Sequence, residues 1–109
     1  MSSYLVQVSY SVEALASLIE NPQNRTEAVR KSVKKLGGKL VGLWLSFGDS
    51  DVVVIVEMPD NISAAALALS VGGSGTARSI KTTPLLSVEE GLAALEKAGS
   101  SSYKPVVAK

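Results

Sequence analysis

Short runs in which every second residue is apolar predict β-strands at four places along the chain. The first run, residues 4–10, puts tyrosine and valine side chains on one face of a strand. Residues 39–47 and 51–58 are the clearest strands, and residues 77–83 form a weaker, more polar one. Because the turn residues Gly48-Asp49-Ser50 separate the second run from the third, the sequence predicts a β-hairpin there.

Between the first two predicted strands, the apolar residues recur at helical spacing and predict helix. Ser11 is placed to cap a helix that continues to residue 21, where Pro22 ends or kinks it. The helical pattern resumes over residues 26–36. Gly37-Gly38 then predicts a left-handed stop.

Two more helices are expected after the hairpin. A stretch rich in alanine and leucine predicts a helix over residues 62–71, which Gly72-Gly73-Ser74-Gly75 ends. Ser87, followed three residues later by Glu90, has the pattern of a capping box. It opens a short helix that we predict over residues 88–98.

The predicted elements follow the order β-α-β-β-α-β, with one further helix at the C-terminal end. This order is typical of the α+β, ferredoxin-like fold, an antiparallel four-stranded sheet with its two main helices on one face. Residues 1–98 are therefore expected to form a single domain, and residues 99–109 a mobile tail.

The two strands of the hairpin are apolar on both faces. In the second strand, Val53 and Ile55 alternate with apolar residues of the opposite face. In the first strand, the residues expected on one face are Leu40, Gly42 and Trp44. A sheet with helices on one side only exposes its other face to water. We therefore expect a second copy of the chain to cover it, in a homodimer or a higher homo-oligomer. The alternative is that the C-terminal helix folds across its own sheet.

Composition excludes several classes of chemistry. The chain has 109 residues, of which 46% are apolar and 19% charged, and it has no histidine and no cysteine. Disulfides, zinc fingers, thiolate nucleophiles and histidine-based triads are therefore excluded. Any acid–base chemistry would need a carboxyl group, lysine or tyrosine with a displaced pKa. We expect no cofactor and no metal site.

The charge and the hydropathy of the chain indicate its surroundings. The net charge is +1, too small to imply a polyanionic partner. The N-terminal residues have neither the basic region nor the apolar core of a signal peptide. No apolar stretch reaches the length of a membrane span. We therefore expect a cytoplasmic protein without membrane contact.

The hairpin and several positions around it resemble the GYD-domain family, small bacterial and archaeal proteins without an assigned activity. The family's motif is Gly-x-Tyr-Asp, and Gly48 and Asp51 match its first and last positions, while Ser50 stands where the tyrosine is expected. Further matching positions are Arg25, Leu36-Gly37-Gly38-Lys39, Glu57, Pro59, Asp60, Gly75 and Thr82. The resemblance covers roughly residues 3–88 and implies a dimeric α/β-barrel.

Two carboxylates are weak candidates for catalysis. Asp51 begins a strand that we expect to be buried, where desolvation would raise the pKa of its carboxyl group. The favoured interpretation is structural: Asp49 and Asp51 accept hydrogen bonds from turn amides, and Gly48 supplies a positive φ. Glu57 is a charged residue within an otherwise apolar strand.

Polar and aromatic residues within the strands indicate a ligand cavity between the sheet and the helices, or hydrogen bonds across a subunit interface. In such a cavity a few polar groups orient an apolar molecule. The residues that we expect to bind a ligand are Gln7, Tyr10, Trp44, Gly48, Asp51, Glu57 and Arg78. Ordinary core or interface packing of the aromatic residues is the alternative.

Six of the eleven basic residues lie between residues 25 and 39. A phosphate-binding face is one interpretation, and a solvated helix face is the favoured one, because no aromatic residue is interleaved for base stacking. The glycines of residues 72–75 follow a helix, whereas a phosphate loop precedes one, so they are not a phosphate site. Arg78, just beyond them, can still reach a ligand.

Three functions remain open. The first is a module that binds a small ligand or a partner as an obligate dimer. The second is a cofactor-independent enzyme, because proteins similar in fold include monooxygenases, isomerases and cyclases. The third is anion or nucleic-acid binding through the basic segment 25–39.

Overall fold

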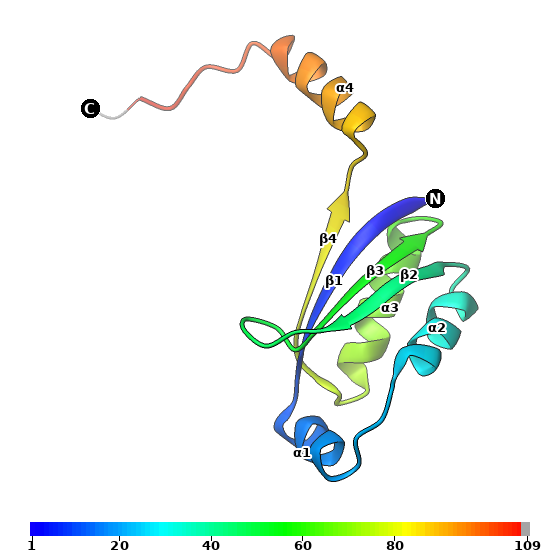
Figure 1. Ribbon diagram of the computed structural model, residues 1–109. Coiled ribbons are helices and arrows are strands. Elements are labelled where there is room, and N and C mark those ends of the chain that lie inside the picture. Colours follow the sequence, from blue (N-terminus) through cyan, green and yellow to red (C-terminus); the bar gives the residue numbers. More distant parts are fainter. Residues whose placement is uncertain (108–109) are drawn as a thin grey trace.

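The computed structural model describes residues 1–107 as four strands and four helices (Figure 1). In chain order, the elements are β1 (Ser2–Tyr10), α1 (Val12–Glu20), α2 (Thr26–Lys35), β2 (Lys39–Leu45), β3 (Val52–Met58), α3 (Asn61–Gly73), β4 (Ala77–Leu85) and α4 (Val88–Gly99). The predicted order of elements is confirmed, and the break at Pro22 divides the first helical segment into α1 and α2.

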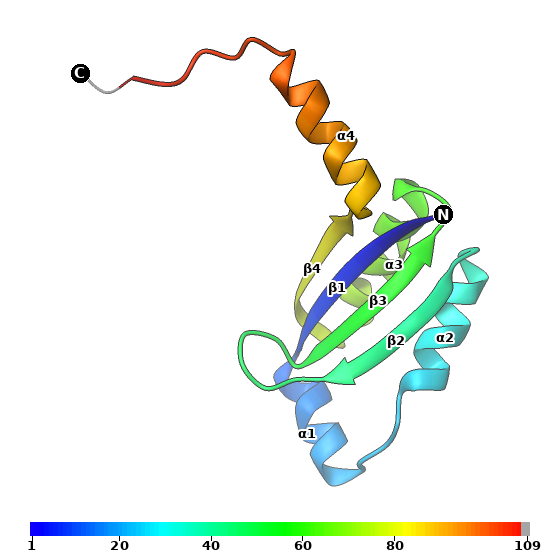
Figure 2. The ribbon, with the colours of Figure 1, turned by 45° about the horizontal axis from the view of Figure 1, so that its top comes forward.

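The four strands form one antiparallel sheet in the order β2-β3-β1-β4. Both α2 and α3 lie on the same face of this sheet, and α1 lies at the end where β1 finishes (Figure 2). This arrangement is the predicted α+β, ferredoxin-like fold.

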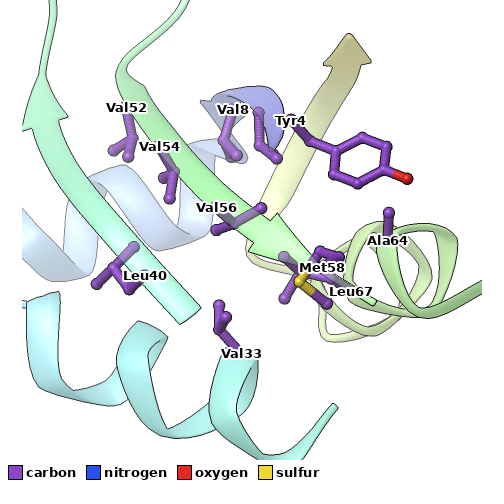
Figure 3. Close-up of a cluster of buried hydrophobic side chains, with 11 residues drawn as sticks. Tyr4, Val8, Val33, Leu40, Val52, Val54, Val56, Met58, Ala64 and Leu67 are labelled. Carbon is purple, nitrogen blue, oxygen red and sulfur yellow. The ribbon is translucent and has the colours of Figure 1, made fainter. Parts of the chain in front are cut away.

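The hydrophobic core lies between the sheet and the two helices α2 and α3. Every second residue of β1 and β3 is buried on this side, because alternate side chains of a strand point to the same face. Met58, Val56 and Val33 are the largest fully buried side chains. Figure 3 shows the cluster, which comprises Tyr4, Val6, Val8, Val33, Leu40, Val52, Val54, Val56, Met58, Ala64 and Leu67.

A β-bulge at Val41 changes which residues of β2 share a face. Leu40 pairs with Val56, whereas Gly42 pairs with Ile55, so one residue of β2 has no partner in the register. Leu40 therefore faces the helices, while Gly42 and Trp44 lie on the other side of the sheet. Our expectation that Leu40 shares a face with Gly42 and Trp44 is wrong, because simple alternation does not hold across a bulge.

The conformations of several glycines bear on the expectations. Gly72 and Gly73 lie within α3, which ends at Gly73, so the helix ends inside the glycine-rich stretch 72–75 and not before it, and the positive φ falls at Gly75, at +80°. Gly37 has a φ of +83°, as the left-handed stop requires. Gly48 is not among the residues with positive φ within residues 1–107, so the expectation for that residue is wrong.

The face of the sheet opposite α2 and α3 is called the open face below. The last helix, α4, leaves the end of β4 and extends away from the sheet, so it does not cover this face (Figures 1 and 2). The radius of gyration is 17.4 Å, against about 13 Å for a compact chain of this length. The alternative in which the C-terminal helix covers its own sheet is therefore wrong.

The C-terminal segment departs from the predicted boundary at one residue. Gly99, predicted as the start of a mobile tail, is the last residue of α4. Residues 108–109 of that predicted tail lie outside the described residues. Between residues 1 and 107, no helix has the length and apolar character that a membrane crossing requires.

Candidate functional site

A cleft of about 250 Å³ separates the sheet from the facing sides of α2 and α3. Its apolar walls include Val6, Val8, Val52 and Val54 from the sheet, and Val29 and Leu67 from the helices. The helices also present short side chains to it, namely Ala28, Ser32, Ala68 and Ser70. Because these side chains are short, the two helices do not fill the space between them, and a largely apolar cleft remains.

A wider groove of about 870 Å³ lies between α1, the segment before α2 and the β2–β3 hairpin. Leu15 and Ile19 form one wall, and Leu45 and Phe47 form the other. All four side chains are exposed, and Phe47 fully so. The groove therefore offers apolar surface that is open to solvent.

Three residues, Tyr10, Arg25 and Leu43, line both the cleft and the groove. The two spaces therefore meet at these side chains. We call this place the junction. Tyr10 and Arg25 bring one hydroxyl group and one guanidinium group into otherwise mainly apolar surroundings.

The Tyr10 hydroxyl is a free hydrogen-bond donor at the junction. Burial raises the pKa of Tyr10 above its ordinary value of 10.0; the positive charge of Arg25 opposes this rise, and the Asp51 carboxylate adds to it. The phenol is therefore neutral at physiological pH. Within residues 1–107, its oxygen forms no hydrogen bond.

Asp51 closes the end of the β1–β3 ladder. Its Oδ2 accepts a hydrogen bond from the backbone N–H of Tyr10 at 2.8 Å, and its own N–H donates to the carbonyl of Val8 at 2.8 Å. Asp51 therefore has a structural role, but its donor is an amide of β1 and not the turn amide that we expected, and its carboxylate replaces a backbone acceptor where the ladder stops. Asp51 also lines the groove beside Tyr10.

Gln7 and Arg78 lie apart from the junction, in a shallow polar pocket of about 220 Å³. The other residues of this pocket are Ser9, Asp49, Ser50, Ser79 and Lys81. Gln7 pairs with Lys81 on one side and with Val53 on the other, which places it on the open face. Ser50, at the position of the family's tyrosine, also lines this pocket, away from the cleft.

Trp44 and Glu57 also lie on the open face. Trp44 follows Gly42 on that face, and its ring covers the glycine, since a Cβ on Gly42 would meet the indole carbons. Glu57 pairs with Lys39 and Ser3 in the sheet register. Glu57 and Asp51 stand at opposite ends of β3, too far apart to act on one substrate.

The structure therefore brings together only some of the residues predicted for a site. Tyr10 and Asp51 meet at the groove, while Gln7, Trp44, Glu57 and Arg78 do not join them. The predicted Gly48 lies in the hairpin loop, with open space around its Cα.

Arg25 is a residue of the candidate site that the sequence had predicted only as part of a basic, solvated helix face. Its place in the sequence groups it with the basic segment 25–39, but Arg25, although exposed, lines both the cleft and the groove, and the other basic residues of that segment line neither. The spacing of Arg25 from the apolar residues of α2 is the feature of the sequence that indicates its position. Arg25, Val29 and Val33 follow one another at intervals of four, which places Arg25 on the core-facing side of α2.

The antiparallel order β2-β3-β1-β4, with both main helices on one face, defines a ferredoxin-like α+β domain. Within this class, the chain matches the family model of the GYD domain over residues 4–95. It therefore belongs to the GYD-domain family, and the resemblance seen in the sequence is confirmed. A search of curated proteins returned no match to the chain.

Proposed function

We propose that the protein is a homodimeric module that binds a small, largely apolar molecule in the cleft between the sheet and helices α2 and α3. The observation that carries the proposal is the junction, where a free Tyr10 hydroxyl and the Arg25 guanidinium border a mainly apolar cleft. Small-molecule sites have this character, with apolar walls and a few polar groups that fix orientation.

The size of the cleft supports a ligand. Domain cores are packed about as densely as organic crystals and contain few voids larger than a water molecule. An unfilled space of about 250 Å³ removes contact partners from the valines and from Leu67 that line it. A bound apolar molecule restores these contacts, and the groove gives it a route of entry.

The open face supports the homodimer. Leu5, Val53 and Ile55 lie on it, and Trp44 beside them has 52% of its surface exposed. α2 and α3 lie on the opposite face, and α4 extends away from the sheet (Figure 2). An apolar sheet face of this kind is characteristic of an interaction surface, and symmetric homodimers are the commonest assembly of soluble proteins.

The geometry favours binding over catalysis. The Asp51 carboxylate is engaged by the Tyr10 N–H, and Glu57 lies on the opposite face from the cleft. Unlike Arg25, which precedes α2, the basic residues of α2 line neither the cleft nor the groove. A cytoplasmic location also belongs to the proposal, since a chain without cysteine needs no oxidising compartment to fold.

The neutral fluorescent probe N-phenyl-1-naphthylamine tests the binding site, because its emission rises when it enters an apolar pocket. Ala68 lines the cleft, and Ala65 on the same helix is exposed. We expect Ala68→Phe to fill the cleft and lower the affinity for the probe at least about tenfold, and Ala65→Phe to leave it unchanged. Circular dichroism confirms that both variants fold. Equal binding by the two folded variants would place the probe elsewhere and contradict the proposal.

A further inference from the structure

Arg25 has no carboxylate partner in the part of the chain that the structure describes. The ion pair within residues 1–107 joins Arg30 to Glu27 on the outside of α2. The hydrogen bond of the Arg25 side chain is a long one, 3.3 Å from Nη1 to Oε1 of Gln23. A guanidinium carries five N–H donors in a planar fork, so most of the donors of Arg25 remain available at the junction.

Tyr10 adds a second donor at the same place. Its phenol stays protonated at physiological pH, because burial raises its pKa. Within residues 1–107, no hydrogen bond joins this hydroxyl to the nearby Asp51, whose Oδ2 accepts from the Tyr10 backbone N–H. The junction therefore presents two kinds of donor to a ligand, and within residues 1–107 their one protein acceptor is the Gln23 side chain, on Arg25.

The charged residues at the junction indicate how much negative charge the ligand carries there. Arg25 is the one cation among the described residues that line the cleft or the groove, and Asp51 contributes a negative charge nearby. A single guanidinium matches a carboxylate, with its one charge and two coplanar oxygens. A dianionic phosphate would need further cations, and Lys31, Lys34 and Lys35 of α2 do not line either space.

The space beside the junction determines the rest of the ligand. Beyond Arg25 and Tyr10, the cleft continues between the valines of β1 and β3 and the helices. A polar group placed there would lose its contacts with water, whereas a hydrocarbon chain or ring would be favoured. The ligand must then be polar at one end only.

We infer that the ligand is an amphipathic monocarboxylate whose acidic head is held by Arg25 and the Tyr10 hydroxyl at the junction, with its apolar tail in the cleft. This inference rests on the proposed function, because it names the class of ligand that the same cleft takes. It assigns Arg25 as the residue that determines the preference for an acid over a neutral molecule.

Octanoate and octan-1-ol form a matched pair of probes, since they share one chain length and differ in the charge of the head. Each is titrated against the full chain, with displacement of N-phenyl-1-naphthylamine as the readout. We expect octanoate to bind more tightly than octanol. Arg25→Gln should weaken octanoate binding at least about tenfold and leave octanol binding unchanged. Tyr10→Phe should weaken octanoate binding by a smaller factor, because it removes one neutral donor.

Lys31→Gln is the matched control, since it removes one positive charge from the exposed side of the same helix. An equal loss of octanoate binding in Lys31→Gln and Arg25→Gln would show long-range charge attraction and overturn the inference. Equal affinity for octanoate and octanol, with no effect of Arg25→Gln, would overturn it while leaving the proposed function intact. If neither octanoate nor octanol displaces the probe, and Ala68→Phe and Ala65→Phe bind the probe equally, both the inference and the proposed function are overturned.

Discussion

Gly38 lies at the close approach of α2 to the end of β3. A Cβ on this residue would collide with the sulfur of Met58 and would lie 2.7 Å from the backbone oxygen of Glu57. The backbone oxygen cannot move without disturbing the sheet, and Met58 is fully buried. The glycine is therefore required by packing at this position.

Gly38→Ala should lower the free energy of unfolding by about 1–3 kcal/mol through overpacking. Gly73→Ala is the matched control, because Gly73 is helical and has open space around it. This substitution should stabilise the protein by up to about 1 kcal/mol. Urea unfolding measures both. A Gly38→Ala variant as stable as the original chain would contradict the close packing.

Tyr10 gives a readout of the charge environment at the junction. Since the positive charge of Arg25 opposes the raised pKa of Tyr10, Arg25→Gln should raise that pKa further. The absorbance of tyrosinate as pH increases, compared with that of Tyr10→Phe, isolates this residue from the other two tyrosines. A lower or unchanged pKa in Arg25→Gln would show that the two groups do not interact.

The same pKa has a consequence for alkaline stability. The folded-state pKa of Tyr10 lies above its unfolded value near 10.0. The contribution of Tyr10 to the free energy of unfolding is therefore fully present below pH 10, and it is lost as the pH rises through the folded-state pKa. Tyr10→Phe should show a smaller loss of stability over this alkaline range.

At the scale of elements, the caps determine where the helices begin. The side chain of Asp60 accepts a hydrogen bond from the Ser63 N–H at 2.8 Å and caps α3. Ser87 and Glu90 form the predicted capping box of α4. Both carboxylates have lowered pKa values, because backbone N–H donors stabilise their charged forms.

The Asp60 cap predicts acid sensitivity. Its folded-state pKa lies below the ordinary value of 3.8, so its stabilisation is present above that pH and is lost as the pH falls through the folded-state pKa. Asp60→Asn keeps a capping side chain and should reduce this acid-induced loss, measured by thermal unfolding from pH 6 to pH 2. Asp49→Asn, in the hairpin loop, is the control. Identical acid profiles for Asp60→Asn and the original chain would contradict this role of the cap.

Local patterns explain why the elements and the fold class were predictable. The alternation in residues 4–10 and the Ser87–Glu90 spacing each act within one element, so the sequence alone reveals them. The bulge at Val41 could not be predicted from the sequence, because the residues on both sides of it are apolar at odd and at even positions. The strand pattern is therefore the same with and without the bulge. The glycine-rich stretch 72–75 did not indicate which residue ends α3, since Gly72 and Gly73 are helical and the positive φ falls at Gly75.

The candidate site was less predictable because it depends on tertiary packing. Tyr10 lies beside a space between the sheet and the helices, since it continues the core-facing residues of β1, and the alternation in β1 is visible in the sequence. The cleft itself lies where Ala28 and Ser32 of α2 and Ala68 of α3 present short side chains to the space between the helices, and no local pattern encodes the separation of the two helices. Trp44 was grouped with Tyr10 as a cavity residue, but the bulge directs it to the open face.

For the whole molecule, the two faces of the sheet have separate roles in the proposal. The helix-covered face holds the cleft. The open face, with Leu5, Val53 and Ile55 at its centre, is the surface that we propose to join two copies. Because the sheet separates them, a charge on the open face should disrupt assembly without entering the cleft.

Ile55→Glu should therefore convert the homodimer into a monomer, because it places a charge at the centre of the apolar face. Ala65→Glu is the control, since Ala65 is exposed on α3, away from the open face. Sedimentation velocity at micromolar concentration distinguishes the two states. A monomer in the unaltered chain would contradict assembly through this face.

The most direct test of the proposed site is to map amide chemical shifts by NMR while N-phenyl-1-naphthylamine is added to the full chain. We expect the largest changes at residues that line the cleft, such as Val8, Ala28 and Val54, with little change at Leu5 and Ile55 on the open face. Changes concentrated on the open face, or no changes at all at saturating probe, would contradict ligand binding in the cleft.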